Sequence, residues 1–242
     1  SVDTTASTTS GSCGPDGIQD CRGADSAAEL VRQTEKAATA LCGINADIIG
    51  LMEIENNTTA SLSSLVAAAN AISGCGPYGF INTGTIGSSP TTGDAIKVGL
   101  LYKTSAVMPV GSYAVLTTSV DARFIDSKNR PTLAQTFSQI SNGEKLTVAV
   151  NHLKSKGSDC LDLGDADLND GQGNCSQTRK NAALAMDDWL NSDPTGSGDP
   201  DFLIIGDLNS YAKEDAIKAI ENGPDNTANT FDDYTNLVKA FG

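Results

Sequence analysis

Histidine and tryptophan each occur only once in this chain of 242 residues, and aromatic residues make up just 5% of it. No apolar stretch approaches the ~20 residues needed to span a bilayer, which argues against a membrane-spanning protein. No aromatic-rich apolar segment suggests docking to lipid either. Chemistry that needs an imidazole has a single candidate, His152.

Positive charge is also scarce, since 16 lysine and arginine residues stand against 30 aspartate and glutamate residues, giving a net charge of −14. Such a chain repels nucleic acids and anionic membranes at long range. A polyanionic partner would therefore need a local basic patch on the protein. The apolar share of 39% and the 24 glycines are typical of a globular protein with many turns.

Zinc or redox motifs of the C-x-x-C type are absent, although the chain contains six cysteines. We predict disulfides, with free buried thiols as the alternative. Disulfides indicate an oxidising compartment and hence a secreted protein. A first residue other than Met fits either a removed signal peptide or a segment of a longer protein. The predicted pairs, each joining sequence neighbours across a loop or helix, are Cys13 with Cys21, Cys42 with Cys75, and Cys160 with Cys175.

The hydrophobic pattern predicts helices and buried strands along one layered α/β domain. Ser26 and Glu29 have the spacing of a capping box, and the apolar helical face that follows ends at Gly43. Two further amphipathic patterns predict helices over about 62–72 and 177–190. Near-continuous apolar runs predict strands over 46–52, 97–102, 133–137, 146–151 and 202–206.

The segment over 154–176 has no clear helix or strand pattern, and a loop of this length in a compact domain is usually functional. Asp165, Asp167 and Asn169 have the alternating oxygen spacing of a calcium loop. The glycine stands one place later than that loop requires, and no glutamate ends it. Structural calcium is therefore weighed against a solvated acidic loop that is held by a disulfide.

Three chemically capable side chains follow three different apolar strands. Glu53 follows ADIIGLM, His152 follows LTVAVN, and Asp207 follows FLIIG. Each alone has a simpler explanation, as a solvated turn residue or a hydrogen-bonded core histidine. Because ligands of α/β folds gather beyond the carboxyl ends of strands, we expect the three side chains to lie together.

Basic and amide side chains accompany these strand ends. Lys154 and Lys156 alternate after the histidine, so an extended chain would place both on one side, facing a phosphate. Arg130 precedes a predicted strand, and its planar guanidinium suits a phosphate oxygen. Asn209 lies two residues after the aspartate and suits the orientation of a water or an oxyanion. Together these residues supply the local basic patch that the net charge requires.

Four sequence blocks cover these positions: ADIIGLMEIEN (46–56), NRPTLAQTF (129–137), NHLKSKGSDC (151–160) and GDLNSY (206–211). In this order they resemble the endonuclease/exonuclease/phosphatase superfamily, which includes pancreatic deoxyribonuclease. Together with GSCGPDGIQDCRGAD and DGQGNCSQTR, they are similar to secreted bacterial extracellular nucleases of the ExeM type. The resemblance touches most of the chain. It implies a DNase I-like α/β (α+β) fold, a four-layer sandwich of two packed mixed β-sheets flanked by helices.

The resemblance implies a role for each candidate residue. Glu53 matches the metal-binding glutamate of the first block, and His152 matches the histidine beside the scissile phosphate. Asp207 and Asn209 match the pair that positions or activates the attacking water. The resemblance also implies that Arg130, Lys154 and Lys156 contact phosphate. The two lysines belong to the pattern of the closer, ExeM-type subfamily.

We therefore expect a secreted, divalent-metal-dependent nuclease that hydrolyses phosphodiester bonds of extracellular DNA, or of RNA. Magnesium or manganese on Glu53 would neutralise charge that grows on the phosphate oxygens. Nucleic acid, mainly DNA, is the expected partner, with no membrane and no stable protein partner. One alternative is a phosphodiesterase of the same fold that acts on a phospholipid or another small phosphodiester. Another is a non-catalytic secreted binding module stabilised by calcium.

Two pieces of the family pattern have no match in this sequence. Members usually begin with a strand that carries a metal-site asparagine and end with an Asp-His pair. We therefore expect the first and last strands of the sandwich to be missing, and residues 1–242 to form one domain truncated at both ends. Because removing members of a catalytic unit collapses most of its rate, we expect the chain alone to be inactive or weak. A longer active parent enzyme is the expected source.

Overall fold

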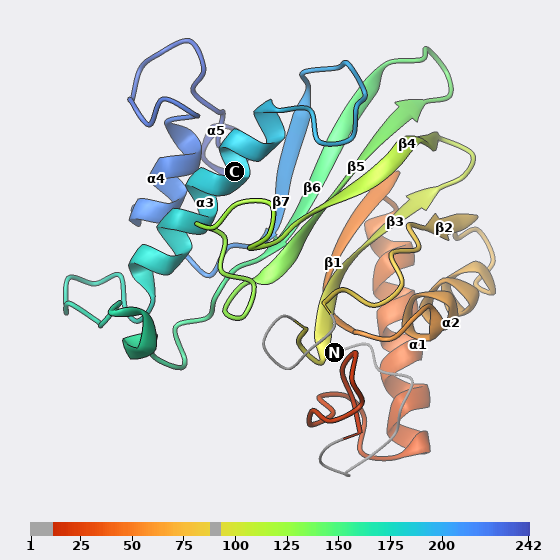
Figure 1. The fold of residues 1–242 in the computed structure, drawn as a ribbon. Coiled ribbons are helices and arrows are strands. Elements are labelled where there is room, and N and C mark those ends of the chain that lie inside the picture. The colour runs from red at the N-terminus through yellow and green to blue at the C-terminus, as the bar shows by residue number, and fades with distance from the viewer. Residues whose placement is uncertain (1–11, 88–92) are drawn as a thin grey trace.

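The computed structural model describes residues 12–87 and 93–242, and it confirms the expected layered sandwich (Figure 1). Two β-sheets pack face to face, with strand orders β1-β3-β2 and β4-β5-β6-β7. Helices α1 and α2 cover the outer face of the first sheet, and α3 and α4 cover that of the second (Figure 1). The strands are β1 (Ile48–Glu55), β2 (Tyr78–Phe80), β3 (Ile96–Lys103), β4 (Val107–Leu116), β5 (Arg130–Gln139), β6 (Lys145–His152) and β7 (Phe202–Asp207). The helices are α1 (Ala27–Ile44), α2 (Ala60–Asn70), η1 (Leu161–Leu163), α3 (Ser176–Asn191), α4 (Asp215–Glu221) and α5 (Leu237–Phe241).

The core between the sheets is made of alternating side chains from facing strands. Leu100 of β3, together with Leu133 and Val150 of the second sheet, is 0% exposed. Burying one such side chain contributes about 1.5–3 kcal/mol relative to leaving it in water. The two sheets are therefore fixed against each other, and so are the side chains that emerge at their edges.

Helix α1 confirms the predicted capping box. The Oγ of Ser26 accepts the N–H of Glu29 at 3.3 Å, and the Glu29 carboxylate accepts the N–H of Asp25 at 3.1 Å. The helix runs one residue beyond the predicted end at Gly43, because Asn45 takes the left-handed conformation with a φ of 53°.

The directions of the strands determine which strand ends lie at the same edge of the second sheet. Strands β6 and β7 are parallel and are joined through α3, so both finish at the same edge. Strand β5 is antiparallel to β6 and therefore begins at that edge. The second sheet is thus mixed, as expected, whereas the described strands of the first sheet are all antiparallel.

Strand β4 was not predicted from the sequence. It forms one edge of the second sheet, and most of its residues are half-buried or exposed. The pairing with β5 breaks between Val110 and Ala114, around Gly111 with its φ of 67°. Pro109 lies in the same strand, and proline is tolerated mainly at sheet edges. A strand so interrupted lacks the apolar run that identified the others.

At the opposite side of the sandwich, β1 and β7 are the edge strands of the described sheets. A methyl group added to Gly50 of β1 would lie 2.6 Å from the Ile205 side chain of β7. The glycine therefore permits the two edge strands to approach closely.

All three predicted disulfides are present: Cys13 with Cys21, Cys42 with Cys75, and Cys160 with Cys175. Within residues 12–87 and 93–242, no helix is long and apolar enough to cross a membrane. These bonds fit the oxidising compartment inferred from the even number of cysteines.

Candidate active site

Three of the predicted site residues meet where β5, β6 and β7 share an edge. His152 ends β6, and its register partners are Arg130 on one side and Asp207 on the other. The Nε2 of His152 lies 3.9 Å from the Oδ2 of Asp207. Backbone pairing continues past the strand ends, because the N–H of Leu153 donates to the carbonyl of Asp207 at 2.9 Å. The sheet thereby fixes the spacing of the three groups.

A tight turn after β7 presents Asp207 and Asn209. Gly206 has a φ of 123°, and an added methyl group there would lie 2.1 Å from the carbonyl oxygen of Asn151. Only glycine can occupy this place. Asn209, with a φ of 47°, donates its side-chain amide to the Leu153 carbonyl at 2.9 Å and its backbone N–H to the Asp207 carboxylate at 2.8 Å. Both side chains are thus held in fixed positions.

Glu53 belongs to a β-bulge rather than to a turn beyond a strand. The predicted strand was expected to stop at Met52, but β1 continues to Glu55. Its pairing with β3 is interrupted between Leu51 and Ile54, and Glu53 has a φ of 55°. Bulges re-aim side chains, and this one leaves Glu53 exposed at the site edge. Its negative charge acts on both His152 and Arg130.

The imidazole of His152 lies in a desolvated position and is only 4% exposed. Burial lowers the pKa of His152, the charge of Arg130 lowers it further, and the carboxylates of Asp207 and Glu53 act in the opposite direction. Its Nδ1 is buried and has no hydrogen-bond partner within the described residues. An orphaned N–H is costly, so we place the proton of the neutral ring on Nε2, facing Asp207.

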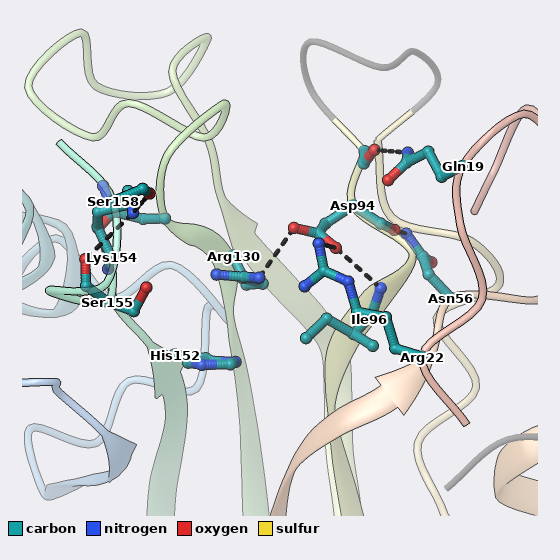
Figure 2. Close-up of polar contacts among 12 residues, drawn as sticks. Gln19, Arg22, Asn56, Asp94, Ile96, Arg130, His152, Lys154, Ser155 and Ser158 are labelled. Carbon is teal, nitrogen blue, oxygen red and sulfur yellow. Dashed lines mark hydrogen bonds and ion pairs between the residues drawn. The ribbon is translucent and has the colours of Figure 1, made fainter. Parts of the chain in front are cut away.

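Sequence reasoning did not identify Asp94, which holds Arg130 from the other sheet. The Arg130 Nη2 lies 2.9 Å from the Asp94 Oδ2, and the Arg22 guanidinium lies 3.4 Å from the same carboxylate. Figure 2 shows Asp94 between the two arginines, with His152 on the strand beside Arg130. Burial lowers the pKa of Arg130, whereas Asp94 raises it. Asp94 precedes its strand, and a search restricted to carboxyl ends of strands passes over it.

The two predicted phosphate-binding lysines do not face one common point. Strand β6 ends at His152, and a turn begins at Lys156. Lys154 is 7% exposed, and its ammonium donates to the Ser158 hydroxyl at 2.7 Å (Figure 2). Burial lowers the pKa of Lys154. Lys156 instead pairs with Glu214 and lies over the ring of Tyr211, 4.6 Å from its centroid.

An open cleft of about 430 Å³ lies beside the β7 turn. Asp207 and Asn209 line it together with Lys156 and Tyr211. Its size falls within the range of about 300–1,000 Å³ that is usual for ligand sites. The cleft gives a substrate access to Asp207 and Asn209.

The predicted calcium residues lie in the loop that precedes α3. The Asp165 carboxylate caps that helix, since it accepts the N–H groups of Gln177 and Thr178 at 3.3 and 2.7 Å. Asp167 accepts the N–H of Asn169 at 2.8 Å, which is a local turn. Capping accounts for Asp165 without a cation, and calcium binding stays a prediction.

The same loop is tied down by Arg179 of α3, which is 1% exposed. Its guanidinium donates to the carbonyls of Lys154, Gln172 and Asn174 and to the Ser210 hydroxyl. Burial lowers the pKa of Arg179, and the charge of Glu214 raises it. Sequence reasoning missed this residue because a helical arginine is normally read as a surface group.

The groups at this edge suit a hard divalent cation with few protein ligands. Within the described ranges, no cluster of three or more His, Cys, Asp or Glu side chains could hold a metal. Magnesium, however, is commonly bound by one or two carboxylates, with water and substrate phosphate as its other ligands. Glu53, on its exposed bulge near His152 and Arg130, fits that donor set.

Comparison with solved structures shows that the chain has the DNase I-like fold of endonuclease/exonuclease/phosphatase proteins. A protein of this name from Bacteroides vulgatus superposes with a TM-score of 0.53 at 13% identity, over 82% of this chain and 66% of that one. A family protein from Bacteroides thetaiotaomicron gives 0.53 at 15%, over 82% and 63%. A mannosyl-6-phosphatase from Bacteroides thetaiotaomicron gives 0.51 at 15%, over 82% and 65%.

At these identities the likeness establishes the fold. The chain spans about three fifths of the length of the solved structures that it matches. A scan against protein-family models found no match, and neither did a search of curated proteins.

Proposed function

We propose that this chain is the greater part of a secreted, divalent-metal-dependent phosphodiesterase, a nuclease of the ExeM type that acts on extracellular DNA or RNA. Residues 1–242 would form a single domain of that enzyme. The observation that carries the proposal is the meeting of His152, Asp207 and Arg130 at one sheet edge, beside an open cleft. Strand-end sites of this kind are where α/β folds bind their ligands.

In the proposed reaction the substrate phosphate lies between Arg130 and His152. The partly buried guanidinium attracts the phosphate oxygens, and Asp94 keeps it aimed from the neighbouring sheet. The neutral imidazole donates from Nε2 to a phosphate oxygen, where charge grows in the transition state. A magnesium or manganese ion bound at Glu53 would add further neutralisation of that charge.

Asp207 is the proposed base for the attacking water. Its side chain is 48% exposed, so water reaches it, and the backbone N–H of Asn209 fixes one carboxylate oxygen at 2.8 Å. The other oxygen faces His152. Proton transfer by such a positioned group typically contributes about 100- to 10,000-fold in rate.

The test is magnesium-dependent digestion of plasmid DNA and of RNA by the full-length parent enzyme and its variants. We expect H152A and D207N to lose about 100- to 10,000-fold in rate with an unchanged melting temperature. The matched control is D201N, because exposed Asp201 precedes the same strand at its opposite end. Loss of much less than 100-fold in both site variants, or cutting that a chelator does not slow, would refute the proposal.

The same assay separates the two alternatives. Release of phosphocholine from sphingomyelin without nicking of plasmid would favour a small phosphodiester as substrate. A rise in melting temperature with calcium, combined with no hydrolysis that responds to E53A, would favour a binding module.

A further inference from the structure

Tyr211 is an exposed aromatic side chain at the mouth of the candidate active site. It is 78% exposed, and it lines the same cleft as Asp207 and Asn209. A single exposed apolar residue is ordinary on a protein surface. This one differs because it lies beside the groups proposed to bind and cleave a phosphodiester.

The ring has a rigid support. The Lys156 ammonium lies 4.6 Å from its centroid and is itself paired with Glu214, which is only 6% exposed. The N–H of Glu214 donates to the carbonyl of Tyr211 at 2.8 Å. On the other side, the Ser210 hydroxyl accepts from buried Arg179 at 3.2 Å. The backbone and one flank of the ring are thus fixed before any ligand arrives.

The pairing with Glu214 also changes what Lys156 can offer. A cation already matched by a partly buried carboxylate adds little attraction for a phosphate. Among the residues that line the cleft, Lys156 is the one that carries a positive charge, in a protein whose net charge is −14. Contacts that do not depend on charge would therefore add to the affinity for a nucleic acid at this side of the site.

We propose that Tyr211 stacks on an unpaired nucleobase next to the scissile phosphate, which makes single-stranded nucleic acid the preferred substrate of this site. The inference rests on the proposed phosphodiesterase function. Aromatic side chains that hold single strands contribute about 1–3 kcal/mol per stacked base, whatever the base. In a duplex the base faces are covered by neighbouring pairs, so stacking on the protein needs a strand that is already open.

The test measures binding of fluorescent oligothymidylate, and of an abasic oligonucleotide of equal length, to the full chain in chelator. The wild-type chain is expected to bind oligothymidylate on the order of 10- to 100-fold more tightly than the abasic strand. The Y211A variant should lose most of that difference, and Y211F, which keeps the ring, should retain it. Hybridising oligothymidylate with its complement should weaken binding to the wild type.

Tyr113 supplies a matched control, because it is an exposed tyrosine on β4 at the far edge of the second sheet. Y113A should bind both strands as the wild type does. Equal wild-type affinity for the two strands, or an unchanged ratio in Y211A, would overturn the stacking role while leaving the phosphodiesterase proposal standing. Absence of binding to both strands, with no cleavage of either by the parent enzyme, would overturn both proposals.

Discussion

Two regions of the molecule differ in the hydrogen bonding of their polar groups: the ends of β5, β6 and β7, and the segment over 154–176. The second region is the more completely hydrogen-bonded. Among the described residues, His152 Nδ1 and Arg130 Nε are buried without hydrogen-bond partners. In the long loop, the carbonyls of Lys154, Gln172 and Asn174 accept from Arg179 of α3, and Asp165 caps the same helix. The loop also carries the bond between Cys160 and Cys175.

Sequence reasoning assigned function to both regions, and the structure separates them. Buried polar groups are normally satisfied, so an exception needs an explanation such as a missing ligand. A satisfied network instead rigidifies the part of the fold that it connects. We infer that the strand ends are arranged for a ligand, whereas the loop supports the wall of the cleft. Substitutions in the loop should then affect stability, and substitutions at the strand ends should affect rate.

Among substitutions that affect the loop, R179M is expected to have the largest effect on stability, because Arg179 of α3 holds the loop through its hydrogen bonds. Methionine fills similar space but leaves the carbonyls of Lys154, Gln172 and Asn174 without their donor. A buried acceptor left unsatisfied costs about 1–3 kcal/mol; the bond to the Lys154 carbonyl is buried and the other two are partly buried, so we expect a total loss of ~3 kcal/mol in urea unfolding. The control is R123M, since Arg123 is 41% exposed and its ion pairs are worth ~1 kcal/mol or less. Equal losses in the two variants would contradict the supporting role of the loop.

Most of the fold followed from hydrophobic pattern and caps. The apolar runs marked β1, β3, β5, β6 and β7, and the capping box located the start of α1. These signals are local, and local signals survive in the folded chain when they agree with the core. β4 was missed because an exposed edge strand with Pro109 and Gly111 has no apolar periodicity. Its position depends on pairing with β5, which is a tertiary contact.

The candidate site was only partly accessible to sequence reasoning. The strand-end pattern predicted that Glu53, His152 and Asp207 lie together, and the register of β6 with β7 pairs His152 with Asp207. Arg130, predicted from its place before a strand, is the register partner of His152 on β5. Asp94 was missed because its contact with Arg130 crosses between sheets. The alternation of Lys154 and Lys156 predicted a common side if the chain stays extended, but β6 ends before them and their ammonium groups have different partners. Side-chain direction after a strand is set by packing that periodicity does not encode.

Asp187 provides a test of whether a buried polar group without hydrogen-bond partners is necessarily functional. It lies on α3 away from the strand ends, is 0% exposed, and neither carboxylate oxygen has a hydrogen-bond partner in the described part of the chain. Burial raises the pKa of Asp187 to about 8, the charge of Asp188 adds to this, and Arg123 opposes it. The phenol of Tyr234 also lies within reach of its charge. We expect this residue to affect stability and not rate.

The sign of the effect follows from proton binding. Between about pH 4 and 8 the folded state keeps a proton on Asp187 that the unfolded state has released, so stability falls as pH rises through this window. D187N mimics the neutral form, and we expect it to gain roughly 2–4 kcal/mol over the wild type at pH 8 and little at pH 4. The exposed neighbour gives the comparison, D188N, which should lessen the pH slope only slightly, because burial contributes more than the charge of Asp188 to the raised pKa of Asp187. A steep loss of hydrolysis in D187N would show that absent partners marked function here as well.

The smallest expected effect concerns Asp165, which sequence reasoning assigned to calcium and the structure places at the start of α3. Removing a helix cap costs about 0.5–2 kcal/mol, so D165A should lower stability by ~1 kcal/mol. D167A is the control, because Asp167 is exposed and accepts only within its own turn. If capping is the role of Asp165, its loss is the same in calcium and in chelator. If calcium stabilises the wild type and both variants abolish this effect, the loop is instead a ligand-binding region, as proposed for the strand ends.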